Sequence, residues 1–154
     1  MAITAEKVGR DLHLRMEGIE APFVVHPLPG RAGVQITDTY LTSMNGEGGV
    51  EDITNALIMA VDGARQNAIT GIWEPVPEDE QVNFTRIGLE LSQDESESIL
   101  MPAFFWQTIL GIKGVQEYIE GGEGLSGTLK AAGALTARLG RLTRRTSPRA
   151  SATV

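Results

Sequence analysis

The alternation of apolar and polar positions near the N-terminus predicts extended structure. Leu12, Leu14 and Met16 alternate with polar residues, which is the period-2 pattern of a half-buried strand. A second apolar segment begins at Phe23, and the prolines that follow it cannot continue a strand, because each removes a ladder donor. We therefore expect a short β-hairpin over about residues 10–29.

After the hairpin, apolar residues recur every three or four positions, which is the period of an amphipathic helix. The first such face carries Val34, Thr37, Leu41 and Met44, and this helix is expected to end at the Asn-Gly pair that follows. A second stripe occupies residues 53–64, where alanines allow another helix to approach closely.

Residues 71–81 interrupt the helical period. Pro75 and Pro77 exclude an ordinary helix interior, so we expect a surface loop here, ending in the acidic cluster 78–80. Carboxylates at the start of a helix are favoured by the helix dipole. The cluster is therefore explained by a helix over about residues 79–91, without a metal.

The clearest helix start lies at Ser92, which forms a capping-box pattern with Glu95 directly before the apolar run 99–110. Pro102 lies inside this run, so the helix is expected either to restart or to kink there. The largest apolar area of the sequence follows at Phe104, Phe105 and Trp106. This segment is predicted to be the centre of the core or a binding face.

Toward the C-terminus, a short helix around Tyr118 is expected to end at a glycine pair. A last segment, residues 125–142, has leucines at helical spacing, although its glycines leave open that it folds only on a partner. The predicted fold is mainly α. It is a small helical bundle with a short N-terminal β-hairpin, forming one domain over residues 1–136, followed by a flexible tail over residues 137–154.

Composition narrows the class of protein. The chain has 154 residues, 42% of them hydrophobic, and no cysteine, which excludes a disulfide scaffold, a cysteine nucleophile and a thiolate metal site. No apolar run approaches the roughly 20 residues that a membrane span needs, and the N-terminus lacks a basic-then-apolar signal pattern. We therefore expect a cytoplasmic protein without a membrane partner.

Charge is distributed unevenly along the chain. Residues 1–137 hold eight Lys and Arg against twenty Asp and Glu, a net charge of −12, whereas residues 138–154 carry +5. The basic residues of this end are Arg138, Arg141, Arg144, Arg145 and Arg149. An acidic body repels phosphate backbones, so nucleic acid is not an expected partner, although the tail could contact RNA or an acidic protein. The simplest interpretation of residues 137–154 is a solvated, disordered end.

Catalytic and ligand-binding motifs are scarce. Residues 122–127 spell G-x-G-x-x-G, but a helix end precedes them and too little chain follows for a βαβ unit, so we expect a connector between helices. His13 and His26 could approach each other across the hairpin, yet no third ligand stands at a characteristic spacing. The sequence therefore predicts no catalytic residue, no cofactor and no metal, and hence not an enzyme.

The order of the elements and several short segments carry a family resemblance. The segments are residues 27–34 (PLPGRAGV), 89–92 (LELS), 103–108 (AFFWQT) and 114–122 (GVQEYIEGG). Together with the Gly/Ala/Leu-rich end and the basic tail, they resemble the shorter product of the tail assembly chaperones of long-tailed actinobacterial phages.

The resemblance implies a function without catalysis. Such chaperones bind the tape-measure protein and keep it soluble in the host cytoplasm until the tail tube polymerises around it, and they are absent from the mature virion. A longer product made by a ribosomal frameshift is a further expected partner, and a homo-oligomer is left open. The alternative is a structural virion protein, such as a tail completion or head-tail connector subunit.

On this hypothesis the partner binds in a groove between the helices at residues 34–44 and 99–110. Trp73, in the proline-rich segment, is a further candidate for an exposed contact, or else it folds back to cap the helices. The expected partner-binding residues are Val34, Leu41, Met44, Trp73, Phe104, Phe105 and Trp106.

Overall fold

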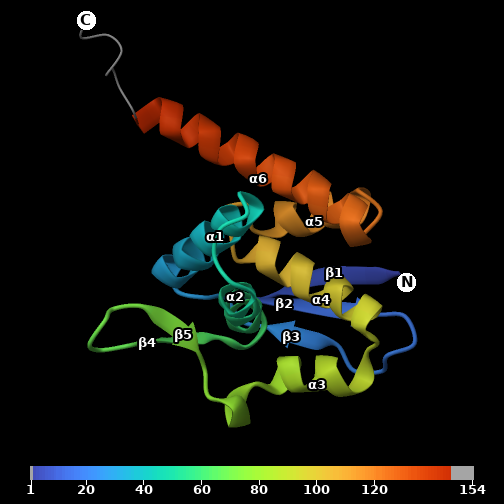
Figure 1. Cartoon of the computed structure of the whole chain (residues 1–154). Coiled ribbons are helices and arrows are strands. Elements are labelled where there is room, and N and C mark those ends of the chain that lie inside the picture. Colours follow the sequence, from blue (N-terminus) through green and yellow to red (C-terminus); the bar gives the residue numbers. More distant parts are fainter. Residues whose placement is uncertain (1, 147–154) are drawn as a thin grey trace, which may run out of the picture.

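A computed structural model describes residues 2–146, with side chains described as far as residue 142 (Figure 1). In this part of the chain the strands are β1 (Ile3–Val8), β2 (Asp11–Met16), β3 (Phe23–Val25), β4 (Ala64–Gln66) and β5 (Trp73–Pro75). The helices are α1 (Gly30–Met44), α2 (Val50–Asp62), α3 (Val82–Glu90), α4 (Gln93–Trp106), α5 (Ile112–Glu120) and α6 (Gly124–Thr146), with a 3-10 turn at Glu78–Glu80. The predicted class, mainly helical with an N-terminal hairpin, is confirmed.

The N-terminal sheet has the order β1-β2-β3 and is antiparallel throughout. Leu12 pairs with Val25 and Leu14 with Phe23, and these four side chains are fully buried on the face that meets the helices. The hairpin expected over residues 10–29 is therefore present as β2 and β3, but its expected bounds miss β1. Only the first residues of β1 face the core, so that strand carries no alternating apolar signal.

Helix α4 lies at the centre of the bundle and packs against α2, α3, α5 and α6 (Figure 1). It begins at the predicted capping box, where the Ser92 N–H donates to Glu95 Oε1 (2.8 Å) and the Glu95 N–H donates to Ser92 Oγ (3.1 Å). The helix is continuous through Pro102 and so does not restart there. Phe104 and Phe105 are fully buried, and their rings pack with that of Tyr40 from α1 at centroid distances of 4.8 and 5.9 Å.

The side-chain amide of Gln107, just after α4, connects three segments of the chain. Its Oε1 accepts from the Leu28 N–H, and its Nε2 donates to the carbonyl oxygens of His26 and Ala60, each at 2.9 Å. The backbone of Gln107 also contacts α1, because a Cβ placed on Gly33 would lie only 2.8 Å from the Gln107 carbonyl oxygen. This residue therefore positions the exit from the sheet, α2 and α1 relative to the end of α4.

The segment expected to be a loop at residues 71–81 contains a strand. β5 pairs antiparallel with β4, with Gln66 opposite Trp73. The turn between them is held by the Asn67 side chain, whose Oδ1 accepts from the N–H groups of Ile69 (2.8 Å) and Thr70 (3.0 Å). The expectation of a loop was wrong for residues 73–75, because strands of three residues are too short to show a period of two.

Helix α3 is capped by an aspartate from a distant part of the chain. The Asp62 carboxylate accepts from the N–H groups of Asn83 and Phe84, both at 2.7 Å, and so satisfies two donors in the first turn of α3. Burial raises the pKa of the Asp62 carboxyl above its ordinary value of 3.8, and the two backbone donors only partly offset this rise. The capping carboxylate is therefore partly shielded from water, which disfavours its charged form.

The C-terminal segment is helical over the residues that the structure describes. α6 is one continuous helix to Thr146, so residues 137–146 are helical rather than part of a flexible tail, and only residues 147–154 of that predicted tail lie outside the described residues. The Ala, Leu and Arg residues of this segment favour a helix and outweigh its glycines. Within residues 2–146, no helix combines the length and apolar character needed to cross a membrane.

Helix α6 packs on α5 at a point where the two backbones nearly touch. A Cβ on Gly127 would collide with the backbone carbonyl of Tyr118, whereas one on Gly133, further along the same helix, would meet nothing within 4 Å. We expect Gly127→Ala to lower the free energy of unfolding by about 1–3 kcal/mol, because the helices must separate. Gly133→Ala is the matched control and should raise it by up to about 1 kcal/mol. Urea denaturation measures both, and equal effects of the two substitutions would contradict the close contact.

The Asp62 cap predicts a dependence of stability on pH. Because the pKa of the Asp62 carboxyl is higher in the folded protein than in the unfolded chain, protonation of this carboxyl stabilises the fold. This contribution is present below pH 3.8 and is lost as the pH rises through the pKa of Asp62 in the folded protein. Asp62→Asn removes this titration. We therefore expect the free energy of unfolding of the wild type, minus that of Asp62→Asn, to fall as pH rises through this window. Urea titrations of both proteins at several pH values test this, and a difference that grows with pH would contradict it.

Candidate functional site

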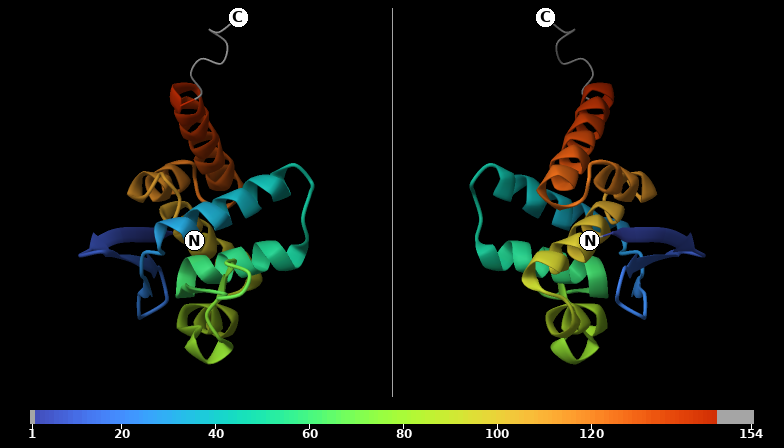
Figure 2. Two further views of the ribbon diagram at one scale, coloured as in Figure 1. Left: turned by 90° about the vertical axis from the view of Figure 1, so that its left-hand side faces the viewer. Right: turned by 90° about the vertical axis from the view of Figure 1, so that its right-hand side faces the viewer.

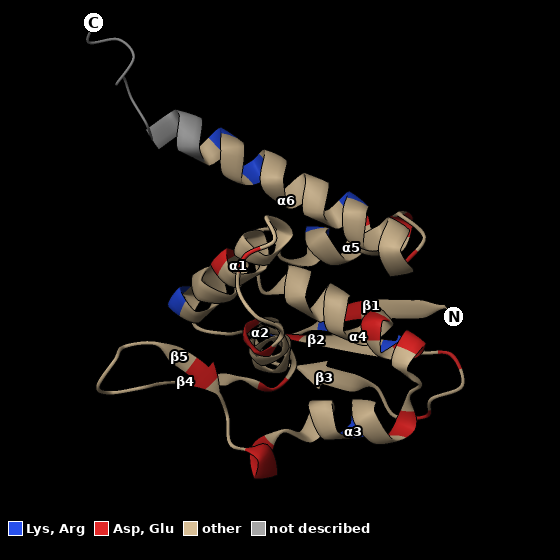
Figure 3. Ribbon diagram, viewed as in Figure 1, with Lys and Arg blue, Asp and Glu red and all other residues tan. Residues whose placement is uncertain are grey.

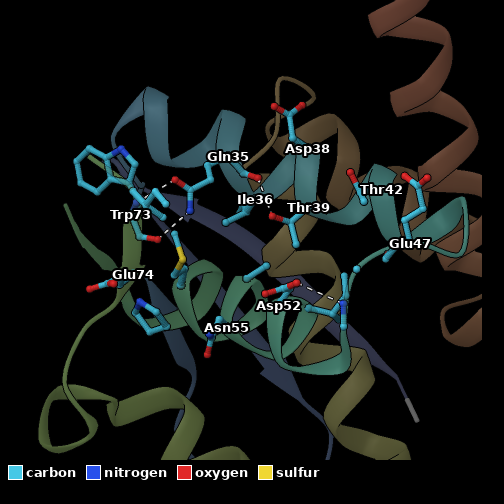
Figure 4. Close-up of a pocket in the computed structure, with 18 residues that line it drawn as sticks. Gln35, Ile36, Asp38, Thr39, Thr42, Glu47, Asp52, Asn55, Trp73 and Glu74 are labelled. Carbon is cyan, nitrogen blue, oxygen red and sulfur yellow. Dashed lines mark hydrogen bonds between the residues drawn. The ribbon is translucent and has the colours of Figure 1, made fainter. Parts of the chain in front are cut away.

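Two hollows flank helix α1, one on each side, and together they form the candidate binding surface. The first, which we call the α1–α2 groove, lies between α1 and α2 and is closed at one end by β5 (Figure 4). Its volume is about 520 Å³. The second, the α1–α6 hollow, lies between α1, the turn after α4, and α6, and its volume is about 330 Å³.

The α1–α2 groove has an apolar floor and an acidic rim. The floor is formed by Ile36, Ile53, Ala56 and Met59. The rim carries four exposed carboxylates, those of Asp38, Glu47, Asp52 and Glu74. Among the described residues that line this groove there is no Lys or Arg, so its potential is negative. Asp52 also accepts a hydrogen bond from the Gly49 N–H (3.3 Å) at the start of α2, which fixes its position on the rim.

The closed end of the groove is held by an amide clamp between α1 and β5. Gln35 Nε2 donates to the Trp73 carbonyl (2.8 Å), and Gln35 Oε1 accepts from the Trp73 N–H (2.9 Å) (Figure 4). The side chain thus pairs with Trp73 much as a neighbouring strand would. Trp73 itself is half-buried and packs against the core, so it folds back onto the helices, one of the two positions expected for it.

The α1–α6 hollow is mainly apolar. Val34 from α1 and Ile109 from the turn after α4 stand at its edge and are 62% and 45% exposed. Leu139 of α6 closes it, and Thr37 and Gln107 contribute to its lining. Its lining combines residues of the two segments to which the sequence analysis assigned a groove, 34–44 and 99–110, with Leu139 of α6, which was not part of that expectation. An exposed apolar patch with polar surroundings is typical of a docking surface.

The residues expected to bind a partner divide into two groups. Val34 and Met44 are exposed and Leu41 is half-buried, so this flank of α1 is accessible. The face of α1 that enters the core is a different one, formed by Ala32, Gly33 and Ile36. Phe104, Phe105 and Trp106 are at most 8% exposed. Their assignment to a binding face is corrected: they form the core, because the apolar area that suggested a surface contact packs inward.

The other motifs of the sequence have structural roles. Residues 121–123 connect α5 to α6, with left-handed backbone at Gly122, whereas residues 124–127 form the first turn of α6, so the expected connector covers only the first part of this motif. The two histidines do not meet, since His13 lies opposite Val24 and His26 Nδ1 contacts Asp11 Oδ1 at 2.7 Å. Within residues 2–142, no three His, Asp or Glu side chains are arranged to hold a metal ion.

Compared with protein-family models, with curated proteins and with solved structures, the chain matches none of them. The assignment of a function therefore rests on the sequence pattern and on the geometry of the two hollows.

The amide clamp predicts that Gln35 maintains the closed end of the groove. We expect Gln35→Ala to lower the free energy of unfolding by about 1–2 kcal/mol and to increase hydrogen exchange at the Trp73 amide, because both hydrogen bonds to β5 are lost. Gln116→Ala, an exposed position on α5, is the control. Amide exchange measured by NMR tests this, and unchanged protection of Trp73 would show that the clamp does not hold the strand.

Proposed function

We propose that this chain is a tail assembly chaperone of a long-tailed phage. It binds an apolar helical segment of the tape-measure protein in the α1–α6 hollow and keeps that protein soluble in the host cytoplasm, without catalysis. The observation that carries the proposal is an accessible apolar surface at the place where the family resemblance predicts partner binding, beside Val34 and Ile109.

The chemistry of the hollow suits a helix as the ligand. An amphipathic helix binds by inserting side chains at positions i, i+3, i+4 and i+7 into an apolar groove, and it needs few polar contacts there. The hollow offers apolar side chains from α1, from the turn after α4 and from α6. Because these elements also pack against the core, the surface is already formed before a partner arrives.

The charge of the chain suits a protein that must keep an apolar partner in solution. The formal net charge is −7, and the carboxylates are spread over the fold, including α1, α2, the segment from β5 to α3, the start of α4 and the loop between α5 and α6 (Figure 3). A complex that carries this charge repels other copies of itself and so resists aggregation. The small size of the hollow also favours modest affinity, which lets the growing tail tube displace the chaperone.

The proposal predicts that the chain keeps a tape-measure protein soluble when both are expressed together. We expect Val34→Asp and Ile109→Asp each to reduce the soluble fraction of the tape-measure protein at least about fivefold, because a charge in the hollow opposes apolar docking. Leu89→Asp is the matched control, since Leu89 is 83% exposed on α3, outside both hollows. Circular dichroism confirms folding of each variant.

Three outcomes would oppose the proposal. A tape-measure protein that is as insoluble with the wild-type chain as without it rules out the chaperone function. Equal activity of all three variants rules out the α1–α6 hollow as the binding site. Mass spectrometry of purified virions distinguishes the structural alternative, because a tail completion or connector subunit would be present in fixed copy number, whereas a chaperone would be absent.

A further inference from the structure

The α1–α2 groove carries negative charge that the rest of the described chain does not neutralise. Its rim carboxylates are Asp38, Glu47, Asp52 and Glu74, and none of them forms an ion pair within residues 2–142. Beneath this rim lies the apolar floor formed by side chains of α1 and α2. A ligand that matches both features has cationic groups on apolar stems.

Such groups are concentrated at the C-terminal end of α6. Arg138 and Arg141 stand three residues apart, on one side of the helix, and neither forms an ion pair among the described side chains. Three further arginines follow in the sequence, at positions 144, 145 and 149, and no acidic residue lies among the five. Arginine packs its aliphatic stem on apolar surface while its guanidinium binds carboxylates in a fork geometry.

The direction of α6 separates its basic end from the groove of the same molecule. The last fully buried residue of α6 is Leu135, and Leu139 closes the hollow on the other side of α1. Beyond these contacts the helix projects away from the bundle (Figure 2). Arg141 lies on this projecting part and is exposed, whereas Arg138 precedes Leu139 and is half-buried. A continuous helix cannot turn back, so Arg141 is available to another molecule.

We propose that the arginine-bearing end of α6 in one copy docks in the α1–α2 groove of a second copy. The contact is heterologous, because it joins two different surfaces of the chain. It therefore closes as a reciprocal dimer if each copy fills the groove of the other, and otherwise extends to larger assemblies. This inference does not depend on the chaperone function, since it uses the α1–α2 groove, whose lining shares Asp38 with that of the α1–α6 hollow but contains neither Val34 nor Ile109.

The contact is electrostatic and accessible to solvent, so salt must weaken it. At an ionic strength of about 50 mM the charges attract over more than 10 Å, whereas at about 500 mM they are screened within a few ångströms. Sedimentation of the full chain over a range of concentrations measures the association. We expect dimers or larger species at low salt and at least about a tenfold rise in the dissociation constant at high salt.

Charge reversal identifies the two surfaces. Arg138→Glu with Arg141→Glu reverses two charges on the cationic side, and Glu47→Lys with Glu74→Lys reverses two charges on the acidic side while leaving Asp38, which also lines the α1–α6 hollow, unchanged. We expect each double variant to be monomeric at low salt when alone, and the two variants to associate when mixed in equal amounts. Lys7→Glu with Arg10→Glu, in and beside the exposed part of β1, changes the net charge as the first variant does and should leave self-association intact.

Each result decides for or against the proposal. Restored association in the mixture supports it, and circular dichroism of each variant alone shows whether it is folded. The proposal is overturned by a wild-type chain that is monomeric at low salt. It is also overturned by association that survives either charge reversal, or by a mixture that does not associate. If the Lys7 and Arg10 variant also loses association, net charge rather than this contact is responsible.

Discussion

The three hydrogen bonds of the Gln107 side chain are the interaction on which the arrangement of this protein depends. A single amide fixes the chain leaving the sheet at His26 and Leu28, the α2 carbonyl of Ala60 and the end of α4. Two of the three bonds, those with the Leu28 N–H and the Ala60 carbonyl, are partly buried, so losing the amide would leave these backbone groups without their partner. Because Gly33 allows α1 to rest directly on the Gln107 carbonyl, the same residue sets the position of the helix that separates the two hollows.

Those elements with strong local signals were predictable from the sequence. The capping box at Ser92, the alternation in β2 and the glycines after α5 each act within a few residues, so local chemistry determines them. β1, β4 and β5 lacked such signals, since short or one-sided strands are stabilised mainly by their neighbours. The end of α6 was assigned to the tail because of its charge and terminal position, whereas residues 137–146 are helical, in line with their helix propensity.

The candidate site was less predictable than the fold, because it is assembled from distant segments. Asp38, Asp52 and Glu74 belong to three elements that carry no common motif, and only their packing forms a rim. Gln35 lacked any signal, since an amide on a helix gives no indication that it will bind the backbone of Trp73. Val34 was a candidate because it shares the helical period of Thr37, Leu41 and Met44, and in the structure it is exposed. The aromatic residues from Phe104 to Trp106 were misassigned because large apolar area is expected both in cores and in interfaces.

The division of α6 into a packed half and a projecting half has a consequence for how this chain can change. Residues up to Leu135 are fixed by neighbouring helices, so substitutions there affect the whole bundle. Arg141, beyond them, is exposed, and its side chain can be replaced with little effect on the stability of the rest. The sign and number of charges on this projection are thus free to vary between related chains, so that specificity of association can evolve on an unchanged scaffold.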